Sequence, residues 1–295
     1  MDYMINFPNL GIHLTHVGKN VSIGGFTIAY YGIVIALGML IGIYAATLRA
    51  EATGQKGDDY IDIAVYTMVF GVLGARIYYV AFSWDAYKDS LIHILNIREG
   101  GLAIYGGIIG GVITIGVLSK IKKIPFPKIL DTIAMSVPIG QIVGRWGNFF
   151  NREAFGDYTN NLFAMQLPVS AVRQHEITET MWQHAEIIDG IQFIQVHPTF
   201  LYESVWNIGV LIILFLTRNK TKFSGELFLR YLVGYSLGRF FIEQLRTDQL
   251  KIPGTDIGVS VVLSSCIFTL CVVMIIAGRY RAAQNGTPAN RNLRN

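Results

Sequence analysis

Two long runs of uncharged residues constrain this chain more than any other feature. Residues 26–48 and 257–278 contain no Asp, Glu, Lys or Arg, and a helix of about 20 apolar residues crosses the hydrocarbon core of a bilayer. Charged side chains make up 15% of the 295 residues, against roughly 25% in soluble domains. So few charges cannot cover a chain of this size in water. We therefore expect a polytopic membrane protein.

Further apolar stretches predict the rest of the fold, although several of them contain charges. They cover residues 60–82, 101–119, 129–150, 199–217 and 226–245. We predict an all-α fold with seven transmembrane helices over residues 26–278, preceded by an N-terminal arm over residues 1–25. The polar connection at about 151–198 is too long for a turn, so we expect a small extracytoplasmic head there. Residues 279–295 form the expected tail, disordered from 284 onward.

The basic residues of the loops predict the orientation in the membrane. The loops 49–59, 120–128 and 218–225, together with the tail, hold nearly twice as many Lys and Arg as the loops on the other side. Cytoplasmic loops carry this excess. We therefore expect an extracytoplasmic N-terminus and a cytoplasmic C-terminus, which agrees with an odd number of spans.

Ionisable groups within a span are costly, so each one is a functional candidate. Several lie at the depth of the outer leaflet, at the ends of outward-running spans and the starts of inward-running ones: Arg76, Arg145, Arg239, Glu243, Tyr31, Tyr105 and Glu203. Others lie at cytoplasmic ends, where we expect them to snorkel or to anchor the helices: Asp62, Asp131, Glu226 and Arg230. The chain thus predicts a polar site on the extracytoplasmic side.

The sixth span presents a row of polar side chains. Tyr235, Arg239, Glu243 and Arg246 recur at spacings of four, four and three, which places them on one helical face. Two arginines beside one glutamate give that face a net positive charge. A ligand site fits this pattern, and a structural ladder of ion pairs fits the spacing equally well.

The end of the fourth span, residues 144–156, reads GRWGNFFNREAFG. Glycines beside Arg145 allow another backbone or a ligand to approach closely. The amides of Asn148 and Asn151 and the carboxylate of Glu153 could orient that arginine or bind a polar headgroup. A polar helix cap is the alternative, but the density of hydrogen-bonding groups favours a site.

Other motifs carry less chemistry. The glycines at 110 and 111 fit tight helix packing, and His197 before Pro198 fits the entry to a helix. Neither the histidines nor the two cysteines, Cys266 and Cys271, have a spacing that suggests a metal site. We therefore expect no metal.

Taken together, these motifs resemble the bacterial phosphatidylglycerol–prolipoprotein diacylglyceryl transferase family over about residues 25–278. The pattern Gly-Arg-x-Gly-Asn-Phe-x-Asn-x-Glu-x-x-Gly is matched in full by residues 144–156. The run His197-Pro198-Thr199, the pair Tyr202-Glu203 and the Arg239, Glu243, Arg246 row also match. One position departs: Tyr105 precedes two glycines where many relatives have histidine. A tyrosine hydroxyl is a poor general base at neutral pH, so we expect Tyr105 to orient a headgroup.

The resemblance implies an enzyme of the bacterial cell (inner) membrane that acts in lipoprotein biosynthesis. Its substrates would be phosphatidylglycerol and the lipobox peptide of a preprolipoprotein, in contact with membrane lipids and without cofactor or nucleic acid. Arg145 and Arg239 would clamp the phosphate, while Glu153 and Glu243 orient them and one of the two accepts the thiol proton. Further substrate-binding candidates are Tyr31, Arg76, Tyr105, Asn148, Asn151, Gly156, His197, Glu203, Tyr235 and Arg246.

Two other classes of protein remain open from the residues alone. A transporter or channel for an anion or lipid could use the same arginines as a binding site. Such a path needs polar groups that continue to the inner leaflet, and the inner halves of most spans are apolar. The third alternative is a scaffold whose charges only pair with one another.

Overall fold

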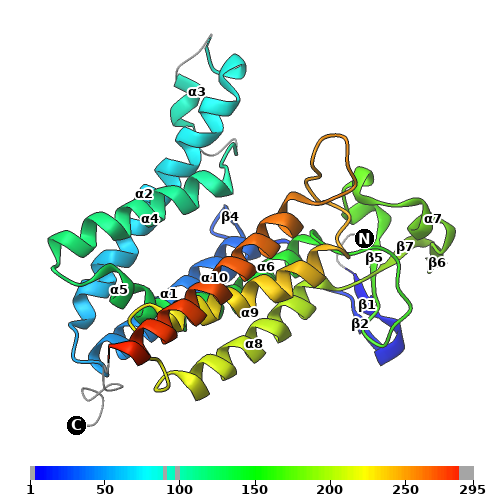
Figure 1. Ribbon diagram of the computed structural model, residues 1–295. Coiled ribbons are helices and arrows are strands. Elements are labelled where there is room, and N and C mark those ends of the chain that lie inside the picture. Colours follow the sequence, from blue (N-terminus) through cyan, green and yellow to red (C-terminus); the bar gives the residue numbers. More distant parts are fainter. Residues whose placement is uncertain (1–3, 89–91, 97–99, 286–295) are drawn as a thin grey trace. The chain divides into compact units, whose positions relative to one another are not determined.

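The computed structural model describes residues 4–88, 92–96 and 100–285 (Figure 1). They divide into unit 1, Met1–Gly42 with Ala134–Asn295, and unit 2, Ile43–Ile133. Five helices are long and apolar enough to cross a membrane: α1 (Tyr30–Glu51), α2 (Gly57–Phe82), α4 (Ile104–Ile121), α8 (Thr199–Thr217) and α10 (Val259–Gln284). The chain is therefore a mostly helical membrane protein, as expected.

Two more helices stand where the remaining spans are predicted. Helix α6 (Ser136–Asn151) has 16 residues, fewer than the about 20 that cross a bilayer without help. Helix α9 (Glu226–Glu243) has 18 residues and contains Glu226, Arg230, Arg239 and Glu243. Neither is identified as a span by length and composition alone, so a bundle of seven transmembrane helices goes beyond these five.

The predicted continuous helix over residues 129–150 is wrong. The structure has α5 (Phe126–Ile133) in unit 2 and α6 in unit 1, with a turn at Ala134 and Met135. Pro138 explains the break, because proline has no N–H to donate and its ring clashes with the carbonyl four residues earlier. It is tolerated in the first turn of α6, where no intrahelical donor is needed.

The predicted all-α fold is wrong for the N-terminal residues, and the first span begins later than expected. Phe26–Ala29 is strand β4, which pairs with β3 (Asn20–Ile23) in an antiparallel hairpin. Gly24 and Gly25 form its two-residue turn at φ of 56° and 85°. Both angles are positive, a backbone conformation that glycine adopts without a steric cost.

A five-stranded antiparallel sheet in unit 1 contains strands from two separate segments of the chain. The strand order is β2-β1-β5-β7-β6. Residues near the N-terminus thereby pair with the long connection between α6 and α8, and Ile5, Leu167 and Ile194 lie fully buried beneath the sheet. The bounds are β1 Ile5–Phe7, β2 Ile12–Leu14, β5 Met165–Pro168, β6 Glu186–Ile188 and β7 Ile191–Val196.

Short helical turns complete this sheet region, which we define as residues 4–19 and 152–198. They are η1 (Pro8–Leu10), η4 (Val169–Ala171), η5 (Gln174–Glu176) and α7 (Glu179–Gln183). Thr178 begins α7 as an N-cap that accepts a hydrogen bond from the Met181 amide, a typical way to satisfy a helix's first donors. The polar connection thus contains regular strands and short helices, and its role as an extracytoplasmic head stays a prediction.

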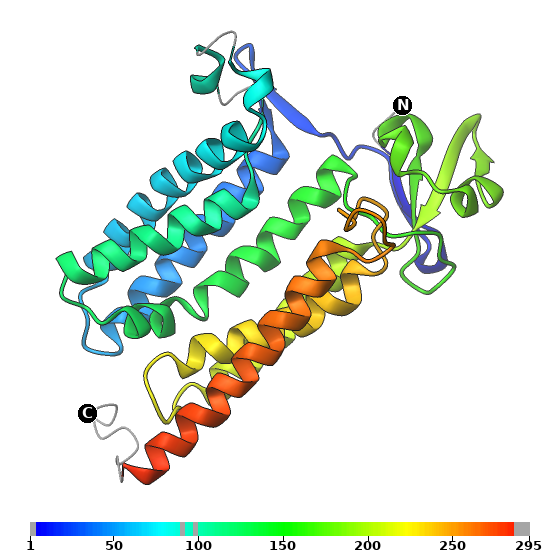
Figure 2. The same ribbon diagram turned by 45° about the horizontal axis from the view of Figure 1, so that its top comes forward.

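The long helices of unit 1 pack pairwise. Helix α6 contacts α8, α8 contacts α9, and α9 contacts α10 (Figure 2). Trp206 of α8 fixes the register against α9: its Nε1 donates to the Gly234 carbonyl at 2.9 Å. Its ring also fills the space that a Cβ at Gly238 would need. This register brings the start of α8 next to the end of α9.

At the other end of α9, Glu226 is fully buried. Its carboxylate accepts hydrogen bonds from Arg230 at 2.6 Å and from Arg279 of α10, whose Nη2 lies at 2.7 Å. Of the two roles expected for this residue, anchoring the helix is the one observed; the side chain does not snorkel. The pairing joins α9 to α10 near their ends.

Unit 2 is built around α2 (light blue to cyan in Figure 1) and α4 (teal green), which pack closely through glycines. A Cβ at Gly74 would lie 3.1 Å from the Gly110 Cα. This confirms the packing role predicted for that glycine. The short elements η2 (Trp84–Ala86) and α3 (Ile92–Leu95) follow α2.

Candidate active site

Glu203, in the second turn of α8, bridges two arginines from two other helices. Its Oε2 lies 2.5 Å from Nη2 of Arg145, near the end of α6. Its Oε1 lies 3.3 Å from Nη1 of Arg239, near the end of α9. The Glu203 side chain is only 5% exposed. Charges inside a membrane protein pair with one another. The shared carboxylate of Glu203 holds the guanidinium groups of Arg145 and Arg239 next to each other.

Two further carboxylates complete the cluster. Glu243 lies one turn after Arg239, with Oε2 2.6 Å from Nη2 of the arginine. Arg246 donates to both oxygens of Asp248, at 2.9 and 2.8 Å, and its Nη1 lies 3.9 Å from Glu203. Three arginines thus face three carboxylates. The net positive face predicted for this row is wrong, because Glu203 and Asp248 balance the charge.

Arg246 follows the end of α9, and its titration reflects these partners. Burial by itself would lower the pKa of the Arg246 guanidinium, but the hydrogen bonds and charge of Asp248 raise it above the usual value. Burial would likewise raise the pKa of Asp248, and Arg246 overcomes that effect and lowers it. Both groups are therefore charged at neutral pH.

The turn after α6 gathers the amides predicted for the site. Arg152 and Ala154 adopt φ of 55° and 58°, so the chain reverses tightly here. Asn148 Nδ2 donates to Glu153 Oε1 at 3.0 Å, and Asn151 Nδ2 donates to the same oxygen at 3.3 Å. In the part of the chain that is described, the carboxylate that contacts Arg145 is Glu203. The expectation that Glu153 orients Arg145 is not met.

Gly156 is held between two backbone segments. Its N–H donates to the His197 carbonyl at 3.0 Å, and on its other side it forms an antiparallel bridge with Arg246. A Cβ at this position would lie 2.8 Å from both the His197 Cβ and the Leu245 carbonyl oxygen. Only glycine fits here, so the motif's last residue connects the turn after α6 to the segments that carry Glu203 and Arg246.

Three aromatic or imidazole candidates lie in the same unit. The ring of Tyr31 occupies the space that a Cβ at Gly147 would need, 2.7 Å from the Tyr31 Cδ2 atom, so it packs on α6. Tyr235 stacks on Tyr231, with ring centroids 5.9 Å apart. His197 Nδ1 lies 3.2 Å from the hydroxyl of Tyr202. Burial lowers the pKa of His197, against an opposing effect of Asp157.

Arg76 and Tyr105 belong to unit 2. Arg76 is buried, and its guanidinium donates to backbone carbonyls of the segment after α2: His93, Ile94, Asn96, Gly100 and Gly101. Tyr105 lies in the first turn of α4. Substrate binding by these two residues stays a prediction.

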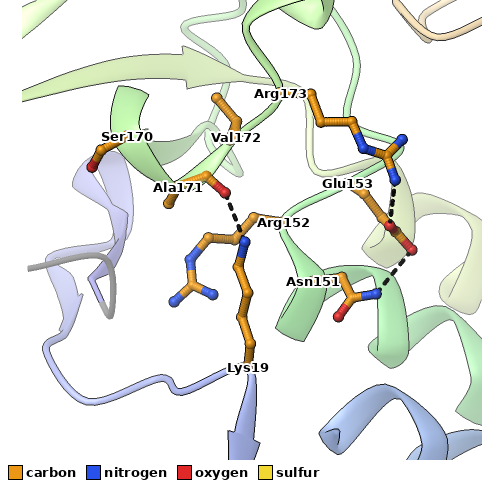
Figure 3. A pocket seen from close by; sticks show the side chains of 8 residues that line it. All are labelled: Lys19, Asn151, Arg152, Glu153, Ser170, Ala171, Val172 and Arg173. Atoms are coloured by element: carbon orange, nitrogen blue, oxygen red, sulfur yellow. Dashed lines mark hydrogen bonds and ion pairs between the residues drawn. The ribbon is translucent and has the colours of Figure 1, made fainter.

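A cavity of about 340 Å³ lies beside the turn after α6 (Figure 3). Glu153 and Asn151 form part of its wall, and Arg173 reaches Glu153 from the segment between η4 and η5, with Nη2 3.4 Å from Oε2. Lys19 closes another side by donating to the Ala171 carbonyl at 2.9 Å. Sequence reasoning missed Arg173, because nothing in its local pattern connects it to a turn 20 residues earlier.

Asp248 was also missed, although a signal for it exists. It lies two residues after Arg246 and directly beyond the end of α9, where a short acidic side chain can turn back toward the arginine. No group of three His, Cys, Asp or Glu side chains among residues 4–88, 92–96 and 100–285 could hold a metal ion. The site therefore consists of arginines, carboxylates and amides.

These features define a class: a helical membrane protein with a buried arginine–carboxylate cluster beside a glycine-dependent turn. A family model described as prolipoprotein diacylglyceryl transferase matches residues 19–277. Proteins named phosphatidylglycerol–prolipoprotein diacylglyceryl transferase are similar to the chain. The one from Bacillus cytotoxicus is 40% identical over 261 residues, covering 88% of this chain and 91% of its own length. The one from Clostridioides difficile is 43% identical over 228 residues, covering 77% and 82%.

The chain belongs to the prolipoprotein diacylglyceryl transferase family. It is thus a membrane transferase of lipoprotein biosynthesis.

Proposed function

We propose that this chain transfers the diacylglyceryl group of phosphatidylglycerol to the thiol of the lipobox cysteine in a preprolipoprotein. The products are a thioether and glycerol phosphate, and the reaction is the first step of lipoprotein maturation. The names of the relatives support these substrates. The buried arginine cluster supports the chemistry, since the reaction turns a phosphodiester into a more highly charged phosphomonoester.

We place the protein in the bacterial cell (inner) membrane, with seven spans. In this arrangement α6 and α9 also cross the membrane, and the charged residues of α9 are shielded by α8 and α10, which pack against it. The N-terminus lies outside, the C-terminus lies in the cytoplasm, and the sheet region forms an extracytoplasmic head. The distribution of basic residues supports this orientation. It puts the arginine cluster where a translocated lipoprotein cysteine emerges.

Arg145 and Arg239 form the phosphate clamp in this proposal. Their side chains are 20% and 16% exposed, so their guanidinium groups are held by carboxylates but are not fully enclosed. Each guanidinium has five N–H donors, more than Glu203 and Glu243 occupy. Fixed cations that are in place before the reaction stabilise developing negative charge without reorganisation. The planar fork of arginine suits phosphate oxygens.

In the proposed step the cysteine sulfur attacks the glycerol carbon that carries the phosphate ester. A C–S bond forms, the C–O bond breaks, and the oxygen keeps the electron pair as the phosphomonoester leaves. The thiol proton passes to Glu153. Between the two candidate bases, Glu243 is 4% exposed and paired with Arg239, whereas Glu153 is 21% exposed and forms part of the cavity wall. Glu243 instead orients Arg239.

The remaining candidates take supporting roles. Asn148 and Tyr31 hold the headgroup beside Arg145, and Asn151 keeps Glu153 turned toward the cavity. Glu203 aligns the clamp. We also assign substrate contacts to Arg76, Tyr105, Gly156, His197, Tyr235 and Arg246.

One observation carries the proposal: a single buried carboxylate holds Arg145 and Arg239 at one level. The test uses purified protein, phosphatidylglycerol vesicles and a lipobox peptide, with glycerol phosphate as the readout. Release that depends on the peptide cysteine supports the transferase. Release that is unchanged when serine replaces that cysteine, or no release from folded protein, contradicts it. Movement of an anion across the vesicle membrane without release would favour the transporter alternative.

A further inference from the structure

Arg173 connects two carboxylates that differ in their surroundings. Nη1 donates to Glu176 Oε1 at 3.0 Å, and Nη2 lies 3.4 Å from Glu153 Oε2. Glu176 is buried, with its side chain 2% exposed, whereas the Arg173 side chain is 60% exposed. A buried carboxylate requires a charged partner, so Glu176 fixes one side of the guanidinium. The other side is thereby directed at Glu153 (Figure 3).

The two oxygens of the Glu153 carboxylate have different partners, and Oε2 is the one that lies 3.4 Å from the Arg173 guanidinium. The other oxygen, Oε1, accepts hydrogen bonds from the side-chain amides of Asn148 and Asn151. Arg173 therefore supplies positive charge on the Oε2 side of Glu153, which the neutral amides on the Oε1 side cannot do.

We propose that Arg173 is a positioning residue for transfer: anchored by Glu176, it holds the Glu153 carboxylate toward the cavity from the sheet region. It touches neither substrate nor reacting atoms and acts only through Glu153. The inference rests on the proposed function, because it assumes that Glu153 takes part in the reaction. It makes segment 169–176 part of the machinery, although the motif at 144–156 contains none of it.

The test is a double-mutant cycle read on kcat for glycerol phosphate release. R173Q removes the charge while keeping a similar shape, and we expect a fall in kcat of about two- to fivefold, the range of partly exposed ion pairs, with the KM for the peptide unchanged. In an E153Q background the same change should cost almost nothing, since its target is gone. R173K should recover at least half of the lost rate, because a lysine still supplies the charge.

H175Q is the matched control. His175 is a neighbour in the same segment, and its Nε2 lies 4.0 Å from Glu176 Oε1; we expect the kcat of H175Q to match that of the parent protein. Removing Arg173 also weakens the support of Glu176, so a lower melting temperature is expected for R173Q. We expect this fall in melting temperature to be the same with Glu or Gln at position 153, whereas the fall in kcat should occur only with Glu.

The outcomes separate the inference from the proposed function. If R173Q lowers kcat equally with Glu and Gln at position 153, or if R173K is as slow as R173Q, Arg173 is merely structural and the inference is overturned. If E153Q is too slow to measure, two other results decide whether Arg173 is a positioning residue: whether R173K recovers the rate lost in R173Q, and whether R173Q changes kcat without changing the KM for the peptide. If the parent protein releases no glycerol phosphate, the proposed function fails first.

Discussion

Glu203 and Arg145 form a buried ion pair across α8 and α6, with 2.5 Å between Oε2 and Nη2. The same carboxylate reaches Arg239 with its second oxygen. An acidic residue shared in this way stops the two guanidinium groups from repelling each other while leaving part of each accessible. Under the proposed function, this bridge would keep the phosphate clamp in shape before a phosphate binds.

Replacing Glu203 tests that role directly. We expect E203Q to destabilise the protein by roughly 1–3 kcal/mol, because a charged hydrogen-bond acceptor between buried arginines is replaced by a neutral one. Transfer should fall at least tenfold, since Arg145 and Arg239 would no longer be held at one level. Thermal melting in detergent and glycerol phosphate release measure the two effects. Normal transfer by a correctly folded E203Q protein would remove the bridge from the mechanism.

Replacing either clamp arginine by lysine keeps the charge and loses the planar fork. For R145K and R239K we expect transfer to fall about 10- to 100-fold, the equivalent of one charge-assisted hydrogen bond of roughly 1.5–3 kcal/mol. Expression should stay near normal. R218K is the control, because Arg218 lies at the far end of α8, over the ring of Phe215. Full activity in both clamp variants would exclude the clamp.

Gly156 gives a steric prediction. G156A should lower both stability and transfer strongly, because its Cβ would lie 2.8 Å from the His197 Cβ and from the Leu245 carbonyl oxygen. We expect a cost of about 1–3 kcal/mol, as for overpacked cores. G209A is the matched control: Gly209 is helical with nothing within 4 Å of an added Cβ. A G156A protein with parental melting temperature and activity would contradict the strand-like contact.

The pH dependence of stability should contain a contribution from His197. Burial lowers its pKa below the usual 6.5, so the folded protein keeps the ring neutral while the unfolded chain takes up a proton at about pH 6.5. This contribution is complete above pH 6.5 and is lost as the pH falls toward the lowered pKa. Melting temperatures between pH 8 and 5 should therefore fall less steeply for H197Q than for the parent.

Much of the site could be predicted from the sequence because intramembrane charges leave few alternatives. Arg145, Glu203 and Arg239 lie at matching depths in their segments, and the cost of an unpaired charge requires them to meet. The lengths of the apolar runs likewise predicted where the long helices lie. Both inferences rest on large free-energy costs, that of an unpaired charge in the membrane and that of a polar group in a span, and the positions of such groups can be seen in a single sequence.

The strands and the exact pairings could not be read in the same way. Strands β1 and β2 have three residues each, too short for a clear alternation, and β1 pairs with β5 across some 160 positions. Glu153 was expected to orient Arg145, but the tight turn at Arg152 and Ala154 directs it to Asn148 and Asn151 instead. Which partner such a side chain contacts depends on the backbone angles of its turn. The residue types in the turn allow these angles but do not require them. The break before α6 was readable, since Pro138 marks it.

The strand β1 has a consequence for biosynthesis. Its partner β5 ends at Pro168 and β7 at Val196, so residues Ile5–Phe7 have to wait until the chain up to Val196 has been made before their sheet can close. Throughout that interval the N-terminal segment depends on other binding partners, or on its own solubility, to avoid wrong pairing.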